Sequence, residues 1–492
     1  MLFNSYGFML FFPVVTILFF IIPKRTRCFW LLAASYFFYM SWNPSYAVLI
    51  LGSTIVTYGA ARIMEEKPSL KRIVIWGSVA INIVLLVFFK YFDFLLANFN
   101  CILNLLHIRL LHKPFDLLLP VGISFYTFQA VGYILDVYRG EIKAERNFFR
   151  YALFVSFFPQ LVAGPIERSK NLLVQMCNIE KIDVWNYERI TQGTVLMLWG
   201  YFLKMVIADR AAIFVDQVYA FYWMYGSVEC ILAAGLFSVQ IYCDFAGYSL
   251  IAIGAAQVMG FRLMENFNAP YFATSVREFW RRWHISLSTW FRDYLYIPLG
   301  GSHGARYRKY VNLMVTFLVS GLWHGASWNY VFWGGTHGLY LILENIVTPY
   351  AKKFIQFTGM RTYGIGYCFL RVIWTFSLVT FAWIFFRMNS LKNSMAFIGK
   401  IWNDWNPWVL FDDSLYRVAL SRMEWGILIA AIVVLFLGDL VRELKGVTIE
   451  HFLHEECLPF RWMVFLLLFF SVVVFGIYGP NFDPKQFIYF QF

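Results

Sequence analysis

Long stretches with almost no charged side chains recur along this chain and restrict its fold more than any other feature. Between residues 311 and 347 the only charged side chain is Glu344, and other apolar runs of roughly 15–25 residues follow one another along the chain. A helix of about 20 apolar residues crosses the hydrocarbon core of a bilayer. The short-period alternation of a transmembrane β-barrel is not visible. We therefore predict an all-α polytopic membrane protein.

Composition and charge support this class. Of the 492 residues, 60% are hydrophobic and only 14% are charged, which is too few to cover a soluble domain of this length. The net charge of +12 is explained by basic cytoplasmic loops. Because every basic segment is flanked by apolar runs, binding to nucleic acid is not expected. Seven scattered cysteines without a CxxC pair indicate neither a disulfide framework nor a metal site.

We predict one membrane-embedded domain spanning residues 1–492. About eleven to thirteen membrane helices would surround a central catalytic cavity, with a catalytic core at about 117–347 and C-terminal helices at about 370–480. Basic clusters place residues 62–72, 167–190 and 277–309 in the cytoplasm and the N-terminus outside. Within this plan, residues 231–260 form a long segment interrupted around Asp244 and at Gly247. Residues 277–298 form an amphipathic helix at the membrane interface.

Two histidines stand out, forty positions apart. His324 lies thirteen residues after Val311, roughly 20 Å along a helix that starts there, and is therefore deep in the membrane. A histidine at that depth needs a partner or a function, so His324 is either a catalytic base or a packed, hydrogen-bonded group. His284 lies among Trp and Arg residues. His337 would face away from His324, by about 220° on a continuous helix, and we predict a structural role for it.

The segment 277–309 carries seven basic and two acidic residues. Arginines bind phosphate through paired hydrogen bonds, so this cluster could form the cytoplasmic mouth of a site for a polyanion such as coenzyme A. A basic loop anchored by tryptophans explains the charge count equally well.

Polar side chains inside apolar runs are functional candidates by default. Gln129 and Asp136 are seven residues apart and share a helix face. For Asp136, Asp244 and Lys204 we favour a buried network of ion pairs or hydrogen bonds that holds helices together. Since the sequence contains no GxSxG elbow and no Ser–Lys dyad, no enzyme nucleophile is expected.

Several long motifs occur in an order that resembles the membrane-bound O-acyltransferase superfamily, and within it the bacterial alginate O-acetyltransferase-like branch. The resemblance covers nearly the whole chain. It rests on EFWRRWHISLSTWFRDYLYIPLGG (278–301), GLWHGASWNYVFWGGTHG (321–338), LPVGISFYTFQAVGYILDVYRG (119–140), FFPQLVAGPIER (157–168), YCDFAGYS (242–249), ENFNAPY (265–271), FAWIFFR (381–387) and FIYFQF (487–492).

The resemblance implies an integral membrane O-acyltransferase of the bacterial cytoplasmic membrane. His324 in LWHG would be the general base and His284 a second active-site residue, which would orient an acceptor, stabilise charge or hold structure. The donor would be a cytoplasmic thioester, most simply acetyl-CoA used as a co-substrate, with no tightly bound cofactor. The acetyl group would pass towards hydroxyls of an exported polysaccharide, with an extracytoplasmic SGNH-type partner. Candidate substrate-binding residues are Arg281, Arg282, Trp283, Arg292, Asp293, Tyr294, Gln129, Asp136 and Asp244.

Two other functions stay open from the sequence. One is D-alanyl transfer to teichoic acid from a carrier-protein thioester, within the same superfamily. The other is a polysaccharide or lipid transporter in which His324 relays protons without acyl chemistry. The absence of an internal repeat argues against a transporter built from inverted repeats.

Overall fold

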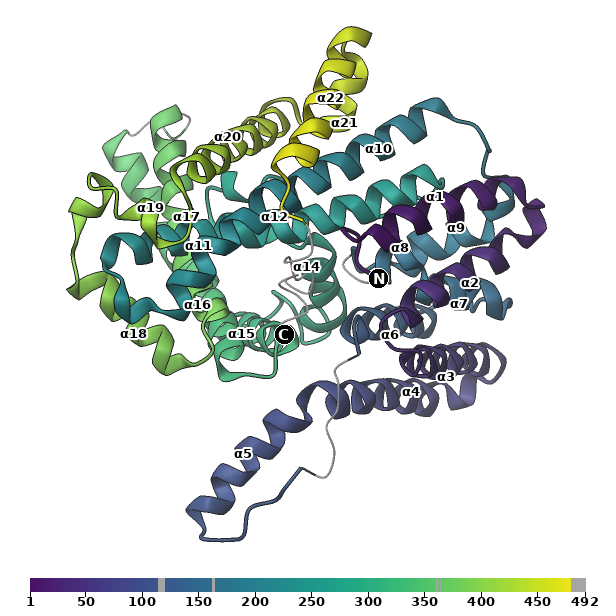
Figure 1. Ribbon diagram of the computed structural model, residues 1–492. Coiled ribbons are helices and arrows are strands. Elements are labelled where there is room, and N and C mark those ends of the chain that lie inside the picture. Colours follow the sequence, from purple (N-terminus) through teal and green to yellow (C-terminus); the bar gives the residue numbers. More distant parts are fainter. Residues whose placement is uncertain (114–119, 162–163, 360–361, 363, 479–492) are drawn as a thin grey trace. The chain divides into compact units, whose positions relative to one another are not determined.

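The computed structural model describes residues 1–113, 120–161, 164–359, 362 and 364–478, and these ranges contain helices and no strand (Figure 1). The all-α prediction is therefore confirmed. By compactness the chain separates into two units. The first contains residues 1–194 and 252–264, and the second contains residues 195–251 and the chain from residue 265 onward.

The first unit contains the N-terminal helices. In it α3 packs against α4, α6 and α7, and α2 packs against α7. Polar side chains join some of these helices, as where the Tyr151 hydroxyl donates a hydrogen bond of 2.7 Å to Thr57. The helices are α1 (Tyr6–Ile21), α2 (Arg27–Met40), α3 (Tyr46–Glu66), α4 (Lys71–Leu86), α5 (Phe92–Leu105), α6 (Ile123–Arg139), α7 (Phe148–Ser156), α8 (Phe158–Leu161), α9 (Val174–Cys177) and the start of α10 (Tyr187–Tyr201).

The second unit contains both conspicuous histidines. Its helices, after the end of α10 and a π-helical turn at Phe202–Ala208, are α11 (Asp209–Ala220), α12 (Ser227–Val258, whose last residues belong to the first unit), α13 (Val276–Arg282), α14 (Ile285–Phe291), α15 (Arg306–His324), α16 (Trp328–Thr358), α17 (Ile365–Arg387), α18 (Leu391–Asn403), α19 (Leu415–Val418), α20 (Arg422–Lys445), α21 (Ile449–Glu455) and α22 (Leu458–Phe475).

Six helical segments in the described residues are long and apolar enough to cross a membrane. They are Tyr46–Glu66, Pro68–Leu105, Tyr187–Ala220, Ser227–Val258, Ile365–Arg387 and Leu458–Phe475. The chain is thus a multi-pass membrane protein. The larger number of membrane segments expected from the sequence stays a prediction. The 487–492 motif and the start of the predicted catalytic core, at about residue 117, lie outside the described residues.

Helix α12 corrects one prediction. The sequence suggested interruptions around Asp244 and at Gly247, but the helix continues through both positions. Gly247 instead allows a neighbouring helix to come close: a Cβ atom there would lie 2.8 Å from the carbonyl oxygen of Gly200. Small residues are typical of such close contacts between membrane helices.

The segment 277–298 is also different from its prediction, since it is not one amphipathic helix. Helix α13 begins after Ser275, whose hydroxyl accepts a hydrogen bond from the Glu278 amide. It ends before His284, which adopts a left-handed backbone with φ of +43°. A new helix, α14, starts there, followed by a π-helical turn at Arg292–Tyr296. A non-glycine residue in this conformation is uncommon and strained.

The apolar run 311–347 forms a helical hairpin instead of a continuous helix. Helix α15 ends at His324, and α16 begins after Ser327, whose hydroxyl caps the Asn329 amide. The two helices pack closely side by side (Figure 1). A Cβ atom at Gly321 would lie 2.2 Å from the Tyr330 carbonyl, and one at Gly334 would lie 2.2 Å from the Phe317 carbonyl. Only glycine therefore permits this approach.

Candidate active site

The structure brings His284 and His324 together. Their ring centroids are 6.5 Å apart, although one ring lies between α13 and α14 and the other ends α15. His284 is fully buried and His324 is 4% exposed. Two titratable imidazoles packed this closely in an apolar interior are a candidate active site.

Aromatic side chains surround His324. Its ring centroid lies 5.0 Å from that of Trp323, 5.0 Å from that of Trp333 and 5.5 Å from that of Phe386. Trp333 comes from α16 and Phe386 from α17, so three helices form this enclosure. The rings leave the imidazole little freedom to change its orientation.

His337 does not face away from His324 as predicted. The error came from assuming a continuous helix, whereas the chain breaks at residues 325–327 and α16 folds back on α15. The Trp333 ring consequently lies close to both histidines, with its centroid 5.0 Å from that of His324 and 5.1 Å from that of His337. The Trp280 indole N–H donates a hydrogen bond of 3.2 Å to Nδ1 of His337.

His284 is held by a hydrogen-bond network centred on Asn266. Asn266 Oδ1 lies 3.2 Å from His284 Nδ1 and accepts a hydrogen bond of 2.7 Å from the Ser286 hydroxyl. Asn266 Nδ2 donates a hydrogen bond of 2.9 Å to the Ser249 hydroxyl on α12. Burial lowers the pKa of His284 to about 3, because the imidazolium form is poorly solvated there. The ring is therefore neutral at physiological pH.

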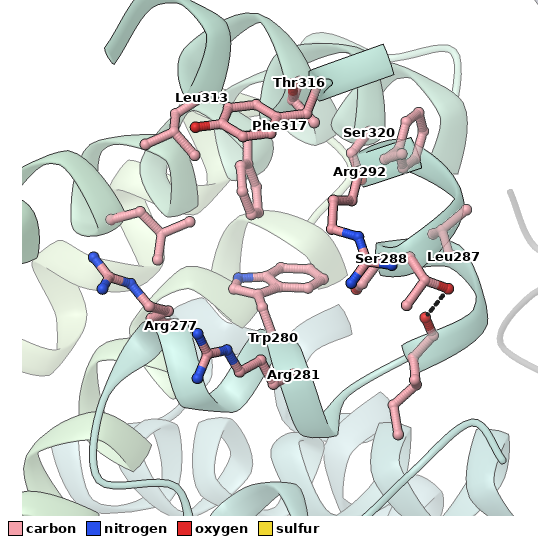
Figure 2. Close-up of a pocket in the computed structure, with 15 residues that line it drawn as sticks. Arg277, Trp280, Arg281, Leu287, Ser288, Arg292, Leu313, Thr316, Phe317 and Ser320 are labelled. Atoms are coloured by element: carbon pink, nitrogen blue, oxygen red, sulfur yellow. Dashed lines mark hydrogen bonds between the residues drawn. The ribbon is translucent and has the colours of Figure 1, made fainter. Parts of the chain in front are cut away.

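A cavity of about 590 Å³ opens beside the two histidines. Its lining includes Ile285, the residue after His284, and Ser320, which is one helical turn before His324. Figure 2 shows the Trp280 indole in the middle of the lining, with Arg277 and Arg281 to one side and Arg292 to the other. Neither histidine lines the cavity itself. The remaining lining residues are Leu287, Ser288, Thr289, Phe291, Tyr296, Leu313, Thr316, Phe317 and Leu341.

The structure separates the two arginines expected to act together. Arg281 lines the cavity and is exposed, and its guanidinium has no ion-pair partner within the part of the chain that the structure describes. Arg282 lies outside the lining and forms ion pairs with Glu278 at 2.6 Å and with Glu443. Its charge is thus balanced by carboxylates, and its role in donor binding stays a prediction.

The other candidates from this segment lie around the cavity in different ways. Arg292 lines it and pairs with Asp293 at 2.7 Å. The Tyr294 ring packs 5.0 Å from Trp290. Trp283 is buried, at 2% exposure. Its ring centroid lies 5.4 Å from that of Phe279 and 5.2 Å from that of Trp383. Trp283 therefore belongs to a buried aromatic cluster and does not line the cavity.

Gln129 and Asp136 lie on α6 in the first unit. Gln129 donates a hydrogen bond of 2.7 Å to the Phe154 carbonyl, and Asp136 accepts one of 2.6 Å from the Ser169 hydroxyl. Both side chains are buried. They join neighbouring segments of that unit, as favoured for Asp136 from the sequence.

Asp244 belongs to a buried ion network in the second unit. Lys204 Nζ lies 2.5 Å from Asp244 Oδ1 and 2.7 Å from Asp209 Oδ1, and each of these residues is at most 4% exposed. The predicted network around Lys204 and Asp244 is confirmed. Asp209 was not singled out from the sequence, although it lies five residues from Lys204, on the following helical turn.

Sequence reasoning also missed four residues beside the histidines. Arg277 was counted only as part of the basic cluster and Trp280 only as an anchor, while Ser320 carried no signal. Asn266 lies in the ENFNAPY motif, which marked the segment as important without indicating what the amide contacts.

Comparison with known proteins identifies the family of the chain. Residues 141–388 match the membrane-bound O-acyltransferase family. The chain is 37% identical to the probable alginate O-acetylase of Pseudomonas syringae pv. tomato, over 88% of this chain and 80% of that protein. It is also 37% identical to the peptidoglycan O-acetyltransferase of Helicobacter pylori, over 74% of this chain and 72% of that protein. The teichoic acid D-alanyltransferase of Bacillus subtilis is 27% identical over 56% of this chain and 70% of its own length. The chain is a member of the membrane-bound O-acyltransferase family and an O-acyltransferase.

Proposed function

We propose that this enzyme moves an acetyl group from cytoplasmic acetyl-CoA towards hydroxyls of an exported cell-surface polysaccharide, with His324 as the general base. The observation that carries the proposal is the pairing of His324 with His284 beside a cavity lined by arginines. The names of the similar proteins, for alginate and peptidoglycan O-acetylation, support a polymer of the cell surface as the final acceptor.

The reaction is a direct transfer. His324 accepts the proton of an acceptor hydroxyl while the oxygen attacks the thioester carbonyl. An O–C bond forms, the C–S bond breaks, and the departing thiolate receives the proton from His324. Because no enzyme nucleophile takes part, hydroxyl and thioester must meet at about 3 Å.

The cavity suits the donor in size and charge. Its volume of about 590 Å³ is within the range of small-molecule sites. Its Trp and Phe side chains can cover an apolar thioester arm, and its arginines can pair with phosphates. A basic, cytoplasmic face at residues 277–309 would admit the donor from the side where acetyl-CoA is made.

The proposed setting is the bacterial inner membrane, with the N-terminus outside. Because the donor is cytoplasmic and the polymer is outside, a further acyl carrier or transferase is needed on the outer face. We propose an extracytoplasmic SGNH-type partner for this step.

D-alanyl transfer from a carrier-protein thioester is the second candidate. It has the support of the Bacillus subtilis relative, whose identity and coverage of this chain are lower than those of the O-acetylation relatives. The family match sets aside the transporter hypothesis.

Donor choice can be tested in inside-out membrane vesicles that contain the protein. Labelled acetyl-CoA and labelled D-alanyl carrier protein are supplied separately, and label is followed into protein and polymer. Transfer from acetyl-CoA, absent from His324→Ala vesicles, is the expected result. Transfer from the D-alanyl thioester alone would replace the proposal with the second candidate.

Arg281→Ala is expected to raise the KM for acetyl-CoA by about tenfold, since a charge-assisted hydrogen bond contributes about 1.5–3 kcal/mol and is partly screened at an exposed position. The kcat should change little, because a phosphate contact is made in the ground state and the transition state alike. Steady-state kinetics with purified protein in detergent measures both constants.

Two arginine variants make this assay specific. Arg422→Ala removes an exposed arginine that pairs with Asp413 at 2.6 Å and should leave the KM unchanged. Arg282→Ala should mainly reduce stability, because it leaves Glu278 and Glu443 without their partner. A KM that rises with Arg282→Ala and stays constant with Arg281→Ala would show that the wrong arginine has been assigned to the donor.

The topology predicts protection from an impermeant thiol reagent at Ser69→Cys and Ser302→Cys, in intact cells that lack the exposed cysteines Cys101, Cys368 and Cys457. Ser69 lies between α3 and α4 and Ser302 precedes α15, and both are exposed. Labelling of both positions in permeabilised cells is the control for reactivity. Labelling of both from outside would reverse the proposed orientation.

A further inference from the structure

The hydrogen bonds around Asn266 define which nitrogen of His284 carries the proton. Asn266 Oδ1 faces three groups: the Ser286 hydroxyl at 2.7 Å, His284 Nδ1 at 3.2 Å and the Ser286 backbone N–H at 3.4 Å. A backbone N–H can only donate, so the amide atom that faces it must be the oxygen. The nitrogen Nδ2 then faces Ser249, as its hydrogen bond of 2.9 Å requires.

The orientation of the amide fixes the imidazole. Because Oδ1 can only accept, His284 Nδ1 must carry the proton. In a neutral imidazole the other nitrogen, Nε2, is then an acceptor. The burial of His284, which lowers its pKa to about 3, keeps the ring in this neutral form.

Backbone hydrogen bonds also hold Asn266 and His284 in this arrangement. The Ile285 N–H donates a hydrogen bond of 2.9 Å to the Asn266 carbonyl, and the Asn268 N–H donates one of 2.9 Å to the Arg282 carbonyl. These bonds clamp residues 266–268 against 282–285, where His284 adopts its left-handed conformation. Strain that is held in place by surrounding bonds is typical of functional positions.

We propose that Asn266 is a positioning residue that holds His284 in the Nδ1–H tautomer, so that Nε2 is a hydrogen-bond acceptor for the hydroxyl substrate. The proposal rests on the proposed function, in which that hydroxyl reacts at His324. It decides between the roles left open for His284. A hydroxyl that reaches Nε2 meets an acceptor, whereas a neutral His284 in this tautomer offers no N–H at Nε2 to stabilise an oxyanion.

The first test reads the tautomer directly. Protein with 15N-labelled histidine is compared in lipid with the His284→Gln variant, and the difference spectrum isolates the two nitrogens of His284. A protonated Nδ1 and an unprotonated Nε2 are expected. The opposite tautomer would overturn the proposal. This readout needs no acyl donor and stands or falls independently of the His324 mechanism.

The second test is a double-mutant cycle between Asn266 and His284. Asn266→Leu keeps the volume but removes the acceptor, and should lower kcat by about 10²-fold, at the lower end of the range for general acid–base groups. In the His284→Ala background the same change should have little further effect, because the two residues act as a unit. Asn266→Asp keeps an acceptor for all three donors and should restore most of kcat.

Asn82→Leu is the matched control. Asn82 is as buried as Asn266, at 1% exposure, and accepts a hydrogen bond of 2.6 Å from Ser53 in the first unit. For an equal loss of thermal stability, Asn82→Leu should lower kcat less than Asn266→Leu does. Independent, additive effects of Asn266→Leu and His284→Ala, or a kcat for Asn266→Asp as low as that of Asn266→Leu, would show that Asn266 acts only through stability. If His324→Ala remained active while the effects of the Asn266 and His284 changes were still coupled, the proposed function would be wrong and the positioning role of Asn266 would stand.

Discussion

His324→Ala is expected to lower the rate of acyl transfer by about 10²–10⁴-fold, the usual contribution of a general base. The donor KM should change little, since the proposed role of the imidazole is at the hydroxyl and His324 lies outside the lining of the cavity proposed for the donor. Rates are measured with purified, folded protein over a range of acetyl-CoA concentrations up to saturation. His324→Gln, which is closer in volume, separates the loss of the base from the loss of packing against Trp333 and Phe386.

The other two histidines provide the comparison. His284→Ala should have a smaller effect than His324→Ala, because it removes an acceptor and leaves the base in place. His337→Ala should act mainly through stability, since its ring packs on Trp333 and accepts the Trp280 hydrogen bond. Near wild-type turnover by His324→Ala would exclude the proposed mechanism.

Lys204→Met is expected to destabilise the protein by about 3–5 kcal/mol, the usual result of removing one partner from a buried ion pair. The change leaves the carboxylates of Asp209 and Asp244 buried, 4% and 2% exposed, without the ammonium group between them. Unfolding followed by loss of helical signal in detergent micelles measures the difference.

Neutralising the whole network should recover much of this loss. In the triple variant Lys204→Met, Asp209→Asn and Asp244→Asn, no uncompensated charge remains in the interior. An exposed pair gives the reference: Arg422→Ala, which breaks the contact with Asp413, should cost less than about 1 kcal/mol. A single Lys204→Met variant as stable as the wild type would mean that the network contributes nothing to folding.

Much of the fold could be predicted because the length of an apolar run and the charges within it can be read from one segment of the chain. The all-α membrane class and the burial of Lys204 and Asp244 in an ion network follow from these patterns. The pairing of His284 with His324 was expected from the resemblance of their motifs, and the structure places their rings 6.5 Å apart. Spacing along the chain could not have given that contact, because forty residues separate the two.

The errors at residues 277–298 and 311–347 arose where the chain changes direction. The assumption of a continuous helix through residues 311–347 predicted that His337 faces away from His324. Ser327 before Trp328 is a helix-start signal that indicates the break. The hairpin that results depends on Gly321 and Gly334, whose close contacts are not visible in one dimension. The partner of Arg282, Glu443, lies 161 residues away, and counting charges cannot find such a pair.

The end of α15 at His324 has a consequence for the chemistry. The last carbonyl groups of a helix have no partners within it, and the aligned peptide dipoles give that end a partial negative charge. In the proposed mechanism His324 takes the proton of the hydroxyl, and the imidazolium would form at this end of the helix. Such an arrangement stabilises a histidine cation by up to about 2 kcal/mol when it is partly buried, or roughly 30-fold in rate if fully expressed in the transition state. The glycine that follows the helix at residue 325 thus places the proposed base where the backbone itself would support its charged form.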